Sequence, residues 1–280
     1  MKVLDIMNLC KNYESFSLDK VSFSIEKGSI TGFIGRNGAG KSTTLKCLLN
    51  LVHADGGNIR FFGMDFTEHE FEIKQKIGFV SGGINYYPKK KLKTITAVTR
   101  NFYKNWDETA YQKYMQMFRL DENKTPDELS EGMKVKYALT LALSHHAELL
   151  ILDEPTSGLH PISRDNLLDV FMELIEKEQV TILFSTHITS DLEKCADNIV
   201  YIKNGKIIAE DSLDNFVGRY KLVSVEREQM PEGLADKLIG CKRERNQMVG
   251  LIETDKLPLK EEVTLSEADL ESIMIHVEKE

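Results

Sequence analysis

A glycine-rich stretch, GRNGAGKST at residues 35–43, constrains the fold more than any other part of the sequence. The apolar run ITGFI comes directly before it, and the helical pattern LKCLLNLV follows it. This order matches the phosphate-binding pattern GxxxxGK followed by Ser or Thr, in which a strand passes through a tight loop into a helix. The chain is therefore expected to contain an α/β domain of the P-loop NTPase type.

The residue types of this loop indicate its ligand. Glycines allow the backbone N–H groups to face inward, and the N-terminus of the next helix adds a positive dipole, so the loop favours a polyphosphate. Lys41 is expected to contact the β- and γ-phosphates, and the Ser42 hydroxyl to ligate Mg²⁺. The sequence thus predicts ATP and Mg²⁺ as cofactors. The predicted nucleotide-binding residues of the loop are Gly35, Asn37, Gly38, Ala39, Gly40, Lys41, Ser42 and Thr43.

A second motif, LLILDEPTSG at residues 149–158, ends an apolar run with two adjacent carboxylates. In open α/β sheets, ligands bind at the C-terminal ends of the strands. Asp153 is expected to hold Mg²⁺ through water, and Glu154 to orient and deprotonate the water that attacks the γ-phosphate. An Asp-Glu pair by itself is usually only solvated. The apolar run before it and the P-loop upstream favour the catalytic interpretation.

The pattern of the whole chain indicates two regions. Residues 1–219 alternate short β-rich runs with helical patterns, which predicts a largely parallel sheet. A helical subdomain with an aromatic and Met core is expected at about 94–146. Residues 220–280 are expected to form a small C-terminal α+β domain or a docking element. Asn204-Gly205 predicts a hairpin turn. The expected strands are 3–9, 21–25, 29–34, 77–80, 148–152, 181–185 and 199–202.

Composition restricts the classes of partner that the chain is expected to bind. The formal net charge is −8, which argues against a nucleic-acid partner because phosphate binding depends on clustered Lys and Arg. One basic run, at residues 89–93, is either a solvated loop or a docking patch. No apolar run approaches the ~18 residues that a membrane helix needs. We therefore expect the chain itself to lie in the cytosol.

The order of these motifs resembles the ABC ATPase family over nearly all of residues 1–219. The segment LSEGMKVKYALTLALSHHAELLILDEP, residues 129–155, is similar to the family's signature loop, helix and Walker B strand. The resemblance implies that Ser130 and Gly132 contact nucleotide, that Tyr13 stacks on adenine, and that His187 contacts the γ-phosphate. Without the resemblance, Tyr13 would be interpreted as a core aromatic residue and His187 as a hydrogen-bonded structural histidine.

The resemblance also implies a function. Members of the family close head to tail over two nucleotides, so a homodimer or heterodimer is expected on ATP binding. The chain would then be the ATP-hydrolysing subunit of an ABC transporter, at the cytoplasmic face of the membrane, with a separate integral membrane subunit. The segments IGRNGAGKST, NFYKNWDE and FSTHITSDLEK resemble bacterial antibiotic-resistance and drug-efflux exporters. Import, or service to a soluble assembly or regulatory machine, remains the alternative.

Four positions depart from the family pattern. Gly82 stands where a Gln or Glu would contact Mg²⁺, and His160 stands where the D-loop has Asp. Glu131 and Met133 occupy variable signature positions. None of these changes removes Lys41, Asp153, Glu154 or His187, so hydrolysis is expected to survive. The adjacent histidines 145 and 146 are not expected to share a metal ion, because helical neighbours point about 100° apart.

Overall fold

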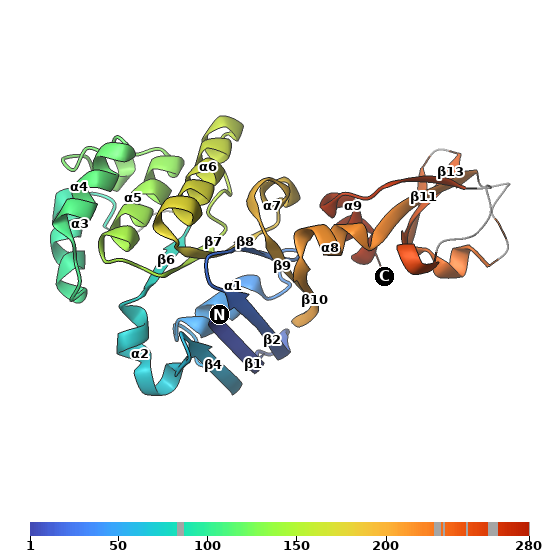
Figure 1. Cartoon of the computed structure of the whole chain (residues 1–280), viewed down its shortest axis with the longest axis horizontal. Helices are drawn as coiled ribbons and strands as arrows, with labels where there is room; N and C mark the ends of the chain where they lie inside the picture. Colours follow the sequence, from blue (N-terminus) through green and yellow to red (C-terminus); the bar gives the residue numbers. More distant parts are fainter. Residues whose placement is uncertain (83–86, 227–230, 232, 245, 257–262, 280) are drawn as a thin grey trace. The chain divides into compact units, whose positions relative to one another are not determined.

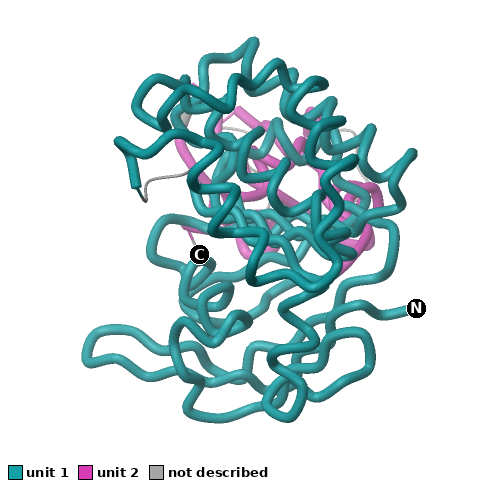
Figure 2. Tube along the Cα trace, turned by 90° about the vertical axis from the view of Figure 1, so that its left-hand side faces the viewer, with its two compact units in different colours: residues 1–210 teal, residues 211–280 magenta. Residues whose placement is uncertain are grey.

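The computed structural model divides the chain into two compact units, Met1–Glu210 and Asp211–Glu280 (Figure 2). The structure describes residues 1–82, 87–226, 231, 233–244, 246–256 and 263–279. None of the helices in these ranges combines the length and the apolar character needed to cross a lipid bilayer.

A six-stranded sheet forms the centre of the first unit (Figure 1). The strands β9, β3, β8, β7 and β6 run parallel, in that order, with β10 at the edge beside β9. Asn204 and Gly205 join β9 to β10 with positive φ angles of 49° and 76°, so the predicted hairpin turn is confirmed. Continuous burial of β3 and β8 explains their unbroken apolar runs. The strands are β3 (Ile30–Ile34), β6 (Ile77–Ser81), β7 (Leu149–Asp153), β8 (Thr181–Thr186), β9 (Asn198–Lys203) and β10 (Lys206–Ser212).

The N-terminal strands do not join this parallel sheet. They form a separate antiparallel sheet of order β2-β1-β4-β5. Its apolar face and that of the central sheet share one core with α1 (Lys41–Leu48), in which Leu45 and Leu48 are fully buried. The P-loop helix is therefore packed within the core of the unit. The strands are β1 (Lys2–Asn12), β2 (Ser17–Glu26), β4 (Gly56–Phe61) and β5 (Met64–Asp65).

A group of helices between β6 and β7 has an apolar core of its own, which includes Leu92, Tyr111, Met115 and Tyr137. Inside it the Thr96 hydroxyl lies 2.7 Å from the Tyr137 hydroxyl. The aromatic and Met residues thus fill a helical core, as expected. These helices are α3 (Leu92–Thr99), α4 (Glu108–Met117) and α5 (Glu131–Ser144), with short 3₁₀ turns at Arg100–Phe102 and Pro126–Glu128. The remaining helices of the unit are α2 (Phe66–Lys74), α6 (Pro161–Glu178) and α7 (Thr189–Cys195).

The second unit is an antiparallel sheet of order β12-β13-β11-β14 with helices beside it. The Phe216 ring of α8 lies 5.6 Å from the Tyr220 ring of β11, measured between centroids. The second compact unit, Asp211–Glu280, therefore includes α8 together with the sheet. The elements are α8 (Leu213–Gly218), β11 (Tyr220–Glu226), β12 (Ile239–Glu244), β13 (Gln247–Glu253), β14 (Thr264–Glu267) and α9 (Leu270–Val277), with 3₁₀ turns at Ala235–Lys237 and Thr254–Lys256.

Candidate nucleotide site

The loop between β3 and α1 wraps around the side chain of Lys41. This side chain is buried, and its Nζ donates hydrogen bonds to the backbone oxygens of Gly35 at 2.7 Å and Arg36 at 3.4 Å. Gly40, directly before the helix, has a φ of 116°, and a Cβ there would lie 2.9 Å from the Phe16 ring. A larger residue would therefore be strained at this position and would clash. The glycine pattern thus fixes the curl of the loop.

Asp153 meets two hydroxyl groups at the C-terminal end of β7. Ser42 Oγ donates to Asp153 Oδ1 at 3.1 Å, and Ser185 Oγ donates to the same oxygen at 2.6 Å. Hydroxyl and carboxylate oxygens are ligands that fit Mg²⁺. Ser42 and Asp153, which come from motifs more than one hundred residues apart, therefore form a donor pair suited to this ion. The contribution of Ser185 was not expected from the sequence.

Glu154 lies between two basic side chains. Its Oε1 is 3.5 Å from Lys41 Nζ, and its Oε2 is 2.8 Å from His187 Nδ1. The backbone of Glu154 is left-handed, with a φ of 51°, and its N–H donates to both Ser185 O and Ser185 Oγ at 3.1 Å. A left-handed non-glycine residue costs about 1–2 kcal/mol. This strained turn places the carboxylate beside the P-loop.

An open pocket of about 600 Å³ joins these groups. The pocket contains the expected Lys41, Glu154 and His187, whereas Tyr13 is not among its lining residues. Tyr13 is half exposed, and its N–H donates to Phe16 O across the β1–β2 turn. Phe16 lines the pocket instead, and the sequence had no local signal to choose between the two rings. The lining residues are Ser15, Phe16, Arg36, Asn37, Gly38, Gly40, Lys41, Ser42, Thr43, Glu154, Ser157 and His187.

The signature residues begin α5 and do not line this pocket. Ser130 caps the helix, and its Oγ accepts a hydrogen bond from Met133 N at 3.3 Å. The Glu131 carboxylate turns toward Lys134, with an Oε1–Nζ distance of 2.6 Å, while the Met133 side chain packs against the helical core. A Cβ added to Gly132 would meet its nearest neighbour at 3.7 Å. Within one chain, the N-terminus of α5 therefore lies outside the pocket that the P-loop lines.

Gly82 and His160 are the other two positions that depart from the family pattern. Gly82 has a φ of 50°, and its N–H donates to Asp153 O at 3.1 Å; among the described residues, none has an atom within 4 Å of an added Cβ. There is thus space for a side chain but a strained backbone. The sequence offers Ser81 or Asn85 as a replacement for the missing ligand, and Asn85 lies outside the described residues. His160 is exposed and precedes α6 without capping it through its side chain.

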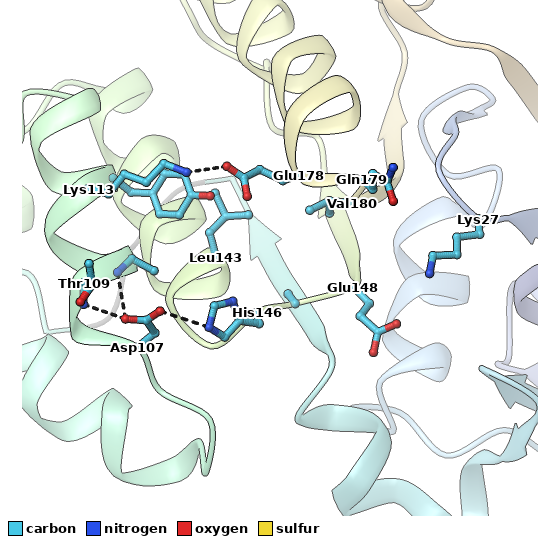
Figure 3. A pocket seen from close by; sticks show the side chains of 13 residues that line it. Lys27, Asp107, Thr109, Lys113, Leu143, His146, Glu148, Glu178, Gln179 and Val180 are labelled. Atoms are coloured by element: carbon cyan, nitrogen blue, oxygen red, sulfur yellow. Dashed lines mark hydrogen bonds and ion pairs between the residues drawn. The ribbon is translucent and has the colours of Figure 1, made fainter.

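A second pocket, of about 480 Å³, lies at the N-terminal ends of β7 and β8 (Figure 3). Figure 3 shows Lys113 of α4 pointing at Glu178 of α6, with an Nζ–Oε1 distance of 2.6 Å. On the other side, His146 Nε2 lies 3.4 Å from Asp107 Oδ2. The hydrogen bond from Lys113 lowers the pKa of Glu178. These contacts join different elements of the unit to one another.

His145 lies in the core next to this pocket. Its ring stacks on Tyr103 at a centroid distance of 3.7 Å, and its Nδ1 is 3.1 Å from Gln75 O. Burial lowers the pKa of His145 to about 4. The two adjacent histidines thus have different partners, one in the core and one at the surface.

Comparison with known proteins identifies the family. The family model described as ABC transporter matches residues 18–157. A bacitracin transport ATP-binding protein of Bacillus licheniformis is 32% identical over 220 residues, covering 78% of this chain and 72% of that protein. The ABC transporter ATP-binding protein YtrB of Bacillus subtilis is 30% identical over 203 residues, covering 72% of this chain and 69% of that protein. A solved structure of the ATP binding subunit of an ABC transporter is 28% identical, with a TM-score of 0.66 over 76% of this chain and 91% of that one. The chain therefore belongs to the ABC transporter family, as an ATP-binding domain of that family.

Proposed function

We propose that the chain binds MgATP at the P-loop pocket, hydrolyses it, and drives export through a separate integral membrane subunit. The observation that carries this proposal is the position of the Glu154 carboxylate, between Lys41 of the P-loop and His187 after β8. A carboxylate at this place can accept the proton of a water that attacks the terminal phosphate. The Lys41 ammonium, 3.5 Å from this carboxylate, can stabilise the charge of a phosphate bound next to it.

Each residue has a distinct role in this proposal. The P-loop residues Gly35 to Thr43 surround the phosphates with N–H groups, and Lys41 exchanges its contacts with loop carbonyls for contacts with phosphate oxygens. Ser42 and Asp153 would hold Mg²⁺, which supplies charge neutralisation when bound. An aromatic ring of the β1–β2 turn packs against the base. The family resemblance assigns this role to Tyr13, while the pocket contains Phe16.

His187 orients the general base. A carboxylate only accepts hydrogen bonds, so in the 2.8 Å contact the proton lies on His187 Nδ1. This contact fixes one oxygen of Glu154 and leaves the other beside Lys41. The base is thereby aligned before the water arrives, which reduces the entropy cost of the reaction.

A second copy of the chain, or a related one, completes the site. The α5 N-terminus, with Ser130 and Gly132, offers N–H groups and a helix dipole for an anion. It does not line the pocket of its own chain. A head-to-tail dimer would place it over the γ-phosphate of the partner. Closure on ATP and opening after hydrolysis then drive the membrane subunit, because the nucleotide states differ in affinity for the two forms.

The change Glu154→Gln tests the chemistry. The amide keeps the size of the side chain but accepts a proton poorly, so hydrolysis should fall by about 100-fold or more while MgATP binding remains. The variant should elute as an ATP-bound dimer in size-exclusion chromatography. Glu148→Gln, at the other end of β7, is the matched control. Near wild-type turnover would exclude Glu154 as the base, and a monomer at saturating ATP would contradict the head-to-tail dimer.

Purification from membranes tests the transport role and the location at the cytoplasmic face. Both relatives described above are named as transport or transporter proteins, which favours a transporter over a soluble assembly machine. A tagged chain should therefore copurify with an integral membrane protein after detergent extraction. Recovery of the chain in the soluble fraction, with no integral partner, would contradict the proposal.

A further inference from the structure

An ion pair between a buried carboxylate and a partly buried arginine lies close to Glu154 and His187. Asp191 of α7 is fully buried, and its Oδ1 is 2.8 Å from the Nε of Arg164 of α6. The Nη2 of Arg164 also donates to Ser190 Oγ at 2.9 Å. One arginine side chain thus fixes two successive residues of α7. The helices α6 and α7 each begin a few residues after a proposed catalytic residue, Glu154 and His187 respectively.

The hydroxyl of Thr156 brings the turn after Glu154 into the same cluster. Thr156 is buried, and its Oγ1 lies beside the Asp191 carboxylate without completing a well-aligned hydrogen bond within the described residues. Burial raises the pKa of Asp191, while Thr156 and Arg164 act in the opposite direction. A buried carboxylate is costly unless it is paired. Asp191 therefore needs both of its neighbours, and they belong to the segment that carries Glu154.

The geometry points to a role for Asp191 in the reaction: we propose that it is a positioning residue that holds Glu154 and His187 in contact. It does so by joining the Glu154 turn and α6, through Thr156 and Arg164, to the segment that follows His187. The inference rests on the proposed hydrolysis. The proposal adds that the alignment of the base depends on a buried group that is not among the residues lining the nucleotide pocket.

A second set of ion pairs between the same helices provides a control. Lys194 of α7 is 2.6 Å from Asp165 and 2.7 Å from Asp169 of α6, on the exposed side. If Asp191 served only to hold α6 against α7, loss of Lys194 would have a similar kind of effect. If Asp191 positions Glu154 and His187, only its own substitution should change the chemical step.

The test is a double-mutant cycle with His187, measured by steady-state MgATP hydrolysis and by equilibrium ATP binding. Asp191→Asn should lower kcat by about 10-fold, because small misplacements of catalytic groups cost up to about 100-fold, and should leave the Kd for ATP within about twofold. In a His187→Ala background, Asp191→Asn should cause almost no further loss, because the contact that it supports is already absent. Lys194→Ala should leave kcat unchanged.

The outcomes separate the proposals. Failure of the wild-type protein to hydrolyse ATP would contradict the proposed function itself. An equal loss of kcat from Asp191→Asn in both backgrounds, or no loss in either, would overturn the positioning role. If Asp191→Asn does not fold, Arg164→Lys takes its place, because lysine keeps the charge but lacks the two-nitrogen fork. The same dependence on His187 is then expected, and additive losses would overturn the inference.

Discussion

Two pockets lie at opposite ends of β7, and they differ in what their charges contact. At the C-terminal end, Lys41 hydrogen-bonds its own loop, and Glu154 lies between Lys41 and His187 within an open pocket. At the N-terminal end, Lys113 and Glu178 pair closely across two helices. The glycine-rich loop lies at the first of these two ends, whereas left-handed non-glycine residues occur at both: Glu154 at the first, His146 and Gln179 at the second. A pocket suited to chemistry is therefore distinguished by the contacts that its charged side chains make, and not by the presence of charged side chains alone.

The largest effect should come from Lys41→Ala. Loss of the ammonium leaves the β- and γ-phosphate charge uncompensated, so MgATP hydrolysis should fall by about 100-fold or more and nucleotide binding should weaken. Lys46→Ala, an exposed position on the same helix, should have little effect. Turnover close to the wild type in Lys41→Ala would remove the distinction between the two pockets.

The second-largest effect is expected on the pH dependence of the free energy of unfolding, to which His145, next to the second pocket, contributes. Since burial lowers the pKa of His145 to about 4, the unfolded chain binds a proton below about pH 6.5 that the folded chain does not. The free energy of unfolding should therefore fall as the pH drops from 6.5 to 4, by up to ~1.4 kcal/mol per pH unit from this group.

Urea denaturation at several pH values measures this dependence. In His145→Gln the pH slope of stability should be smaller than in the wild type, even if the variant is less stable at pH 7. His146→Gln, the exposed neighbour, is the control. Equal slopes in all three proteins would show that His145 is not held neutral by burial.

A smaller effect is expected from Gly82→Gln, which restores the missing amide. The described residues leave space for the side chain, but the left-handed backbone is strained by about 1–2 kcal/mol. We expect hydrolysis by the isolated subunit to increase a few-fold when Mg²⁺ is limiting. Gly82→Ala carries the same strain without the amide and separates the two effects in a Mg²⁺ titration. A fall in activity specific to the Gln variant would show that Gly82 is not aligned with the missing ligand.

The smallest effect should come from the Lys113–Glu178 pair. Both side chains are partly exposed, so their coupling energy in a double-mutant cycle should be only about 0.5 kcal/mol. Hydrolysis in Lys113→Ala and Glu178→Gln should stay within about twofold of the wild type. A large loss of activity in either variant would assign the second pocket a part in the ATPase cycle.

The sequence by itself determined the elements and motifs that depend on neighbours in the chain. The P-loop follows from a strand, a glycine-rich turn and a helix in sequence, and Asn204-Gly205 specified its hairpin by conformational preference alone. The helical core around Tyr111 was readable because its spacing follows the period of a helix. These features are local, so one sequence is enough to reveal them.

Only the tertiary structure decided how distant segments meet. It separated β1, β2 and β4 into their own antiparallel sheet, because pairing partners are chosen by packing and not by the pattern of one strand. It placed Phe16 in the pocket and joined Ser185 to Asp153, although no spacing links these residues. Arg164 and Asp191 meet because the successive helices α6 and α7 pack together across β8, and burial of the Asp191 carboxylate then requires it to find a partner.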